Sequence, residues 1–198
     1  MIQKHASSGA STAAPPARPR STGGGQAAER GTGPARMFPT KNDLPAATRA
    51  HVIELLNARL ADCIDLQSQC KQAHWNVKGP GFIALHRLFD EINNDVEEYV
   101  DLLAERVVQL GGVAEGTARM VAGRTTLREY PMVTDGEDHV DALSSALAAF
   151  GSVARKAIEQ VDELDDADSA DILTEISRGV DKWLWFVEAH QQQQPDGA

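Results

Sequence analysis

Two histidines and three of the carboxylates between residues 74 and 105 stand at spacings that suit a metal ion. His86 and Asp90 are four residues apart, and Asp101 and Glu105 repeat this spacing further along the chain. Side chains four residues apart lie one turn above each other on a helix. Asp101 follows Asp90 by eleven residues, which is close to three whole turns, so both pairs point the same way. Imidazole with carboxylate is a ligand set that suits Fe, Zn or Mn.

The stretch that carries these residues has the pattern of one long helix. Apolar residues recur with helical periodicity over residues 82–108, and a Gly-Gly pair at 111–112 supplies the stop. At about 1.5 Å rise per residue, the step from Asp90 to Asp101 separates the two pairs by roughly 16 Å. Metal–ligand distances are about 2 Å, so one metal ion cannot contact both pairs of a straight helix.

A second copy of this helix, running antiparallel, would complete each half-site. A two-fold axis near Val96 places the first pair of one copy against the second pair of the other, twice by symmetry. His74 lies before the Gly79-Pro80-Gly81 break, and we expect the preceding helix to fold over and bring it to the same cluster. The sequence therefore predicts metal sites that two subunits share.

The residues around these ligands carry a wider pattern. The segments are His74-Trp75-Asn76-Val77-Lys78-Gly79, then Phe82-Ile83-Ala84-Leu85-His86 with Asp90, then Asp101-x-x-x-Glu105-Arg106 ending at Gln109-Leu110-Gly111-Gly112. Together with the C-terminal runs at 170–174 and 181–186, they resemble the Dps family of mini-ferritins over about residues 44–190. The resemblance implies an all-α, ferritin-like four-helix bundle with a long crossover that carries a short extra helix. It also implies assembly into a hollow dodecameric shell.

The resemblance further implies a ferroxidase that oxidises Fe(II), with hydrogen peroxide preferred over dioxygen, and stores ferric mineral in its cavity. Two irons are implied per inter-subunit site, with ligands His74, His86 and Asp90 from one subunit and Asp101 and Glu105 from its two-fold mate. The tighter iron is expected at His74, Asp101 and Glu105, and the more labile one at the other two ligands. Zn²⁺ or Mn²⁺ are expected to substitute for iron. Trp75 is implied to lie beside the site as an electron donor, the alternative being a core aromatic residue.

Formal charge is distributed unevenly along the chain. The whole sequence carries −10, but residues 1–41 hold six basic residues and one acidic residue, a net +5, which leaves −15 for the rest. This segment is rich in Gly, Ser, Ala, Thr and Pro, so we expect a disordered tail. Its basic side chains could neutralise DNA phosphates without reading bases. DNA contacts are therefore predicted at Lys4, Arg18, Arg20, Arg30 and Arg36, the alternative being a spacer that keeps the shell soluble.

The bundle is expected over residues 42–190, followed by a short disordered tail at 191–198. Asn42 or Asp43 is expected to cap the first helix, with Pro45 in its first turn. The third helix is expected to begin with the capping box Thr134-x-x-Glu137. His139, in the first turn of that helix, is predicted to lie on the surface.

An acidic turn at residues 162–171 precedes the fourth helix, and Asp168 or Ser169 is expected to cap that helix. By resemblance, pore carboxylates lie in this turn, and Asp166 and Asp171 are the expected pair. Rings of such carboxylates around a three-fold axis would draw Fe(II) inward.

Cysteine usage and hydropathy bear on location. Cys63 and Cys70 are seven residues apart, about 10.5 Å along one helix, which is too far for a mutual disulfide. Unpaired cysteines fit a reducing compartment, so a cytoplasmic, nucleoid-associated location is expected. No apolar run reaches 18 residues, so no transmembrane segment is expected. The first residues lack the apolar stretch of a secretory signal, and a transit peptide stays the alternative.

Two other function classes remain open. One is a non-specific DNA-binding, nucleoid-compacting protein in which ferroxidase activity is secondary. The other is a non-catalytic shell that binds Zn or Mn at the same residues. No Glu-x-x-His occurs in the sequence, so a di-iron centre within the core of one bundle is not supported.

Overall fold

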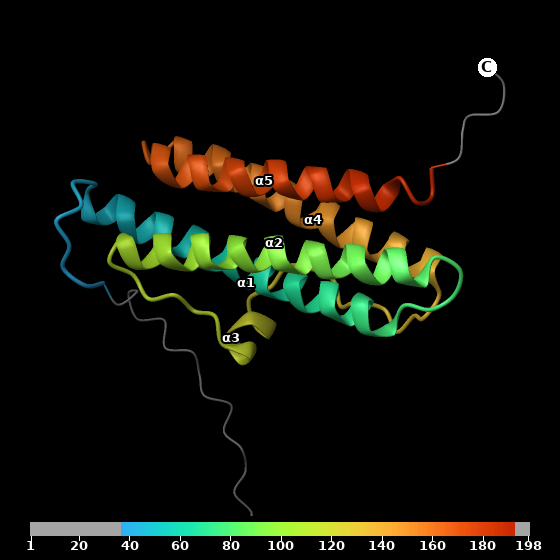
Figure 1. The fold of residues 1–198 in the computed structure, drawn as a ribbon. Helices are drawn as coiled ribbons and strands as arrows, with labels where there is room; N and C mark the ends of the chain where they lie inside the picture. Colours follow the sequence, from blue (N-terminus) through green and yellow to red (C-terminus); the bar gives the residue numbers. More distant parts are fainter. Residues whose placement is uncertain (1–36, 193–198) are drawn as a thin grey trace, which may run out of the picture. The chain divides into compact units, whose positions relative to one another are not determined.

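The computed structural model describes residues 37–192, and over this range the chain is helical with long connections. The helices are α1 (Ala46–Asn76), α2 (Phe82–Gln109), α3 (Ala118–Ala122), α4 (Gly136–Asp162) and α5 (Ala167–Glu188). The four long helices form a bundle, and the short α3 lies in the crossover between α2 and α4 (Figure 1). The predicted ferritin-like arrangement is therefore confirmed. None of the helices in this range is long and apolar enough to cross a membrane.

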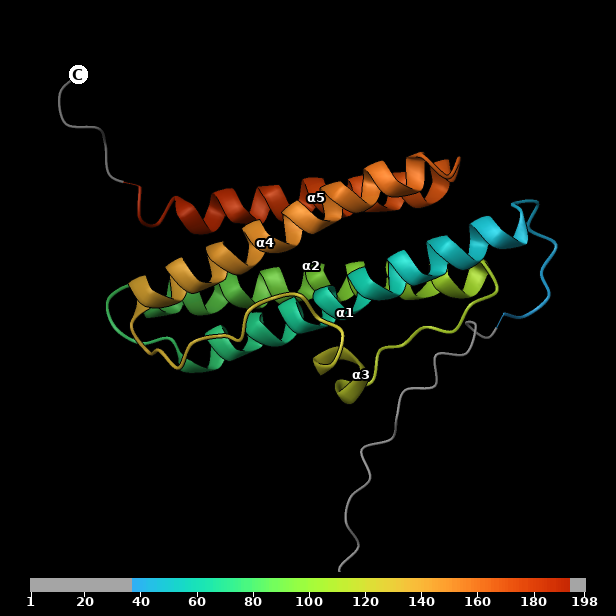
Figure 2. The same ribbon diagram turned by 180° about the vertical axis from the view of Figure 1, so that it is seen from behind.

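The bundle consists of two helical hairpins. α1 packs along α2, α4 packs along α5, and further contacts join α1 to α4 and α2 to α5. The crossover runs from the end of α2 past α3 to the start of α4 at the opposite end of the bundle (Figure 2). The core contains fully buried side chains from all four long helices, among them Leu60, Phe89, Phe150 and Leu173. Burial of this continuous apolar interior is the main stabilising contribution.

A buried carboxylate ties the crossover to α1. Asp62 is fully buried, and its Oδ2 lies 2.7 Å from Nη2 of Arg59. Its Oδ1 accepts hydrogen bonds from the Thr126 backbone N–H (2.6 Å) and the Thr126 hydroxyl (3.0 Å). The Thr125 hydroxyl donates to Asp65 at 2.7 Å. Because a buried charge is tolerated only when paired, these contacts hold residues 125–126 at a defined place on α1.

Two helix starts differ from the sequence prediction. α1 begins after Pro45, and the Asn42 side chain accepts a hydrogen bond from the Leu44 N–H (3.0 Å) instead of capping the helix. α4 is capped by Asp135, whose carboxylate accepts from the Glu137 N–H at 2.9 Å, so the predicted capping box at Thr134 is wrong. At α4 two capping residues stand side by side and Asp135 is the one that accepts, whereas Pro45 precedes α1 and no side chain caps that helix.

His139 is buried, contrary to its predicted surface position. Its Nδ1 lies 2.9 Å from the Tyr130 hydroxyl, and Phe89 packs nearby with 6.2 Å between ring centres. The crossover residue Tyr130 covers the first turn of α4, which explains why a polar residue near a helix start is inside. Burial lowers the pKa of His139, so the neutral imidazole is favoured.

The predicted tails fall largely outside the described residues. This applies to residues 1–36, including all five predicted DNA contacts, and to residues 193–198. Within the described part, the Phe38 N–H donates to the Gly111 carbonyl at 2.7 Å, and the Gln191 side chain donates to the Glu137 carbonyl at 2.8 Å. Ordered contacts therefore extend a few residues beyond both predicted ends of the bundle.

Candidate metal half-sites on the second helix

The α1–α2 turn brings two histidines together. His74 lies in the last turn of α1, and His86 lies in the first turns of α2. Gly79 and Gly81 have φ of +94° and +79°, a left-handed conformation that favours glycine and lets the chain reverse sharply. The two imidazole rings stack with centres 3.7 Å apart and planes 21° apart.

Each histidine is held by the backbone of the other. Nδ1 of His74 lies 2.8 Å from the His86 carbonyl oxygen, and Nδ1 of His86 lies 2.8 Å from the His74 carbonyl oxygen. A carbonyl oxygen can only accept, so in both rings the proton is on Nδ1. Nε2 of each ring therefore keeps its lone pair, which is the arrangement that second-shell hydrogen bonds impose on metal-ligating histidines.

Asp90 completes this group of side chains. Its Oδ1 lies 3.8 Å from Nδ1 of His74 and 2.7 Å from the ammonium of Lys71. The hydrogen bond from Lys71 is the main cause that lowers the pKa of Asp90 below its usual value, so the carboxylate is charged. Lys71 was not predicted from the sequence, although it lies three residues before His74 on the same side of α1. That spacing is the signal that could have identified it.

Asp101 and Glu105 are exposed further along α2. Neither side chain makes a hydrogen bond or ion pair with any residue in the range 37–192. Within that range of one chain, no group of three or more His, Cys, Asp or Glu side chains is arranged to hold a metal ion. His74 contacts both His86 and Asp90, but these three side chains do not form a metal site by themselves, and Asp101 and Glu105 lie apart from them.

Comparisons with known proteins identify the family. The ferritin-like domain family matches residues 53–195. The chain is 47% identical to the DNA protection during starvation protein of Agrobacterium fabrum over 155 residues, which is 78% of this chain and 96% of that relative. The chain belongs to the Dps family of ferritin-like proteins.

Solved Dps structures have the same fold. DpsA14 from Streptomyces coelicolor superimposes with a TM-score of 0.77 at 30% identity, covering 84% of this chain and 98% of that chain. DpsC from the same organism has a TM-score of 0.75 at 32% identity, covering 83% of this chain and 95% of that chain. The alignments span nearly the whole of both structures, so the likeness extends over the entire bundle.

Trp75, next to the histidine pair in this Dps-family chain, points to solvent. Its side chain is 68% exposed, and the ammonium of Lys71 lies 6.0 Å from its ring centre. The alternative of a core aromatic residue does not apply to the described chain. An exposed indole beside His74 is compatible with the expected place near the iron site.

Asp166, in contrast, does not face a pore. It is 2% exposed, its Oδ1 lies 2.7 Å from Nη2 of Arg106, and its Oδ2 accepts from the Ser169 hydroxyl at 2.6 Å. It also caps α5 by accepting from the Ser169 N–H, so Ser169 and Asp168 are not the cap. The expected pore role of Asp166 is therefore corrected to a structural one, while the exposed Asp171 remains a prediction.

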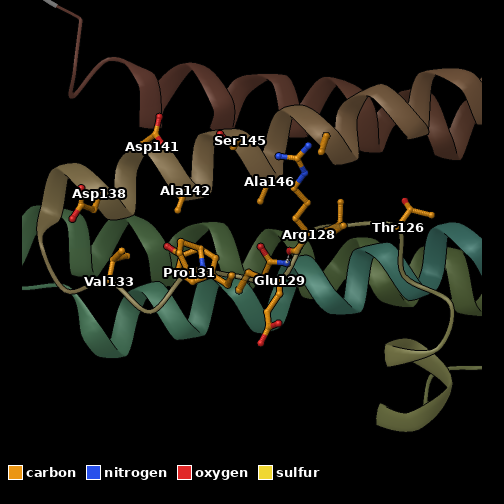
Figure 3. Close-up of a pocket in the computed structure, with 14 residues that line it drawn as sticks. Thr126, Arg128, Glu129, Pro131, Val133, Asp138, Asp141, Ala142, Ser145 and Ala146 are labelled. Carbon is orange, nitrogen blue, oxygen red and sulfur yellow. Dashed lines mark hydrogen bonds between the residues drawn. The ribbon is translucent and has the colours of Figure 1, made fainter.

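A groove between the crossover and α4 is separate from these side chains. It has a volume of about 620 Å³, and its lining includes Arg128, Tyr130, Asp138, Asp141 and Ala142 (Figure 3). None of the five predicted ligands lines it. The predicted ligands, on α2 and in the last turn of α1, therefore lie outside this groove.

Proposed function

We propose that the chain assembles into a closed dodecameric shell and oxidises Fe(II) at sites shared by two copies across a two-fold axis. The observation that carries the proposal is the reciprocal pairing of His74 and His86 through Nδ1, which leaves Nε2 of each neutral ring available as a ligand, with the Asp90 carboxylate 3.8 Å from Nδ1 of His74. Membership of the Dps family supports it independently.

The partner copy supplies what one half-site lacks. An antiparallel α2 that sets His86 opposite the partner's Glu105 also sets Asp90 opposite the partner's Asp101. Two carboxylates that face each other repel unless a cation lies between them. Fe(II) bound there as substrate would relieve this repulsion, and the imidazole nitrogens would also coordinate it.

Hydrogen peroxide is the proposed oxidant. Two Fe(II) ions each give up one electron, and together they reduce one peroxide to two waters with the uptake of two protons. The O–O bond is broken by a pair of electrons, so no hydroxyl radical is released. Two adjacent irons per shared site meet this requirement. Zn²⁺ or Mn²⁺ would compete for the same ligands without turning over in this way.

Lys71 explains why the two irons would differ in affinity. Its ammonium forms an ion pair with the Asp90 carboxylate at 2.7 Å, so a metal ion that binds this carboxylate must displace the ammonium. The position that relies on Asp101 and Glu105 has no such competitor within residues 37–192. The iron held by His86 and Asp90 is therefore the more labile one.

Protection of DNA follows from the same chemistry. Removal of Fe(II) and peroxide together prevents radical formation next to DNA, and the ferric product is stored as mineral in the cavity. The relative from Agrobacterium fabrum is named a DNA protection during starvation protein. We place the protein in the cytoplasm, associated with the nucleoid.

The test removes the partner's contribution. The double variant Asp101→Ala, Glu105→Ala should stay assembled, as judged by size-exclusion chromatography. Its rate of Fe(II) oxidation by peroxide should fall by about tenfold or more. The matched control is Glu91→Ala, Glu98→Ala, which removes two other exposed carboxylates of α2. An unchanged rate in the Asp101/Glu105 variant would refute the shared site. Zn²⁺ binding without Fe(II) oxidation in the parent protein would favour the non-catalytic shell.

DNA binding is the second candidate function. It is favoured by the net +5 of residues 1–41 against −15 for the remaining chain. Many weak arms on one shell would add their affinities. Deletion of residues 1–36 should abolish retardation of DNA in gels at low salt and leave Fe(II) oxidation unchanged. Equal DNA affinity with and without these residues would exclude the basic arm.

A further inference from the structure

An exposed apolar residue lies at each end of the ligand-bearing face of α2. Ile83 is 54% exposed and Val108 is 58% exposed. Ile83 precedes His86 by three residues, and Val108 follows Glu105 by three residues. Asn94, Glu97 and Asp101, which lie between them on this face, are exposed, so within residues 37–192 no other helix covers it. A single exposed apolar residue is common on protein surfaces, so the meaning of these two depends on what the proposed dimer places against them.

The antiparallel register of the shared site also pairs these two residues. When His86 lies opposite the partner's Glu105, the equal offset of three residues sets Ile83 opposite the partner's Val108. The same register sets Asn94 opposite the partner's Glu97, since Asn94 follows Asp90 by four residues and Glu97 precedes Asp101 by four. In this register, therefore, an apolar side chain faces an apolar side chain at Ile83, and the Asn94 amide, a hydrogen-bond donor, faces a carboxylate.

A hollow beside Val108 provides the place for the incoming side chain. It has a volume of about 390 Å³ and is lined by Ala104, Glu105, Val108, Gln109 and Ala114. Two of these residues are alanines, whose small side chains leave room next to Val108. Because Glu105 forms its rim, whatever fills the hollow lies directly against the proposed metal site.

We propose that Ile83 of each copy docks in this hollow of a second copy, against the partner's Val108, and that two such contacts per pair fix the register in which the ligand pairs meet. The proposal rests on the shared site proposed above and names the contacts that align it. The occupant is a second copy because one face of α2 carries both the projecting residue and the hollow, at equal distances from the two-fold axis. Such a self-complementary surface is what a two-fold contact requires.

Cross-linking tests the register directly. In the double variant Ile83→Cys, Val108→Cys, the two positions of one chain are 25 residues apart on α2, about 37 Å at 1.5 Å per residue. A disulfide requires Cα atoms within about 7 Å, so a bond between positions 83 and 108 can form only between copies. Mild oxidation should convert most of the double variant to covalent dimers, with the 83–108 linkage identified by mass spectrometry.

Four controls define the register. Ile83→Cys alone and Val108→Cys alone should stay monomeric in denaturing gels, because equivalent positions lie far apart across the axis. Glu91→Cys, Val108→Cys carries the same number of new thiols and should also fail to cross-link, because in this register position 91 lies eight residues, about 12 Å, along α2 from the partner's position 108. The native Cys63 and Cys70 are buried, so the parent protein should give no dimer. Dimers from either single variant, or none from the Ile83/Val108 variant, would overturn the proposal.

Failure of this inference can be told from failure of the proposed function. If the 83–108 linkage does not form while the Asp101→Ala, Glu105→Ala variant loses Fe(II) oxidation, the shared site stands and the docking contact is wrong. If the linkage forms but the parent protein does not oxidise Fe(II), the docking contact stands and the ferroxidase function is wrong.

Discussion

The ammonium of Lys71 lies 2.7 Å from Oδ1 of Asp90 and joins the end of α1 to the ligand face of α2. The side chains of both residues are partly exposed, at 29% and 44%. This pair holds a positive charge at a place where the proposed function requires a metal ion. Replacing the lysine should therefore affect metal binding more than folding.

Lys71→Met should tighten the weaker metal position by about fivefold at most, because a partly exposed ion pair contributes up to about 1 kcal/mol. Calorimetric titration of the assembled protein with Zn²⁺ measures this change. Lys78→Met, which removes an exposed lysine within the α1–α2 turn, is the control. Unchanged or weaker binding in the Lys71 variant would show that the lysine does not compete with the metal.

Asp62→Ala should destabilise the bundle by about 3–5 kcal/mol, because Arg59 would keep a buried charge without its partner. The N–H and hydroxyl of Thr126 would also lose their acceptor. Chemical denaturation measures the loss, and hydrogen exchange should rise first in the crossover. Glu54→Ala removes an exposed carboxylate paired with Arg124 and should change stability by about 1 kcal/mol or less.

Asp166→Ala should likewise be costly, by about 3–5 kcal/mol, because Arg106 is buried and α5 would lose its cap. Asp168 is the matched control, since its carboxylate lies 3.7 Å from Arg106 but is 83% exposed. Asp168→Ala should stay within about 1 kcal/mol of the parent. Thermal unfolding of the two variants side by side decides the point. Equal stabilities would mean that Asp166 has no special structural role.

His139 should make stability dependent on pH. Burial lowers its folded-state pKa, so below the ordinary value of about 6.5 the unfolded chain binds a proton that the folded chain does not. The contribution of neutral His139 to the stability of the folded chain is therefore present above about pH 6.5. It is lost as the pH falls toward the lowered pKa of the folded state. Stability measured between pH 7.5 and pH 5 should fall less in His139→Gln than in the parent.

His51→Gln, which changes an exposed histidine, is the control for this comparison and should keep the parental pH profile. A His139→Gln variant with the same pH dependence as the parent would show that another group causes it.

Local spacing in the sequence was sufficient to predict the helices. Residues 82–108 were expected to form one helix, and α2 spans Phe82–Gln109. The short helix in the crossover was expected from the family resemblance, and α3 spans Ala118–Ala122. The two ligand pairs on α2 could be recognised for the same reason, because a helix converts a spacing of four or eleven residues directly into a common face.

Contacts between distant segments could not be predicted in this way. Asp166 has the spacing of a surface acid, but Arg106, 60 residues earlier, makes it a buried ion pair. His139 has the position of a surface residue in a first helical turn, but Tyr130 covers it. The sequence alone determined which side chains share a helical face, because helix geometry depends only on nearby residues. The tertiary packing of α1, the crossover and α5 decided which of those faces are buried. It also decided which charged side chains pair with the buried ones.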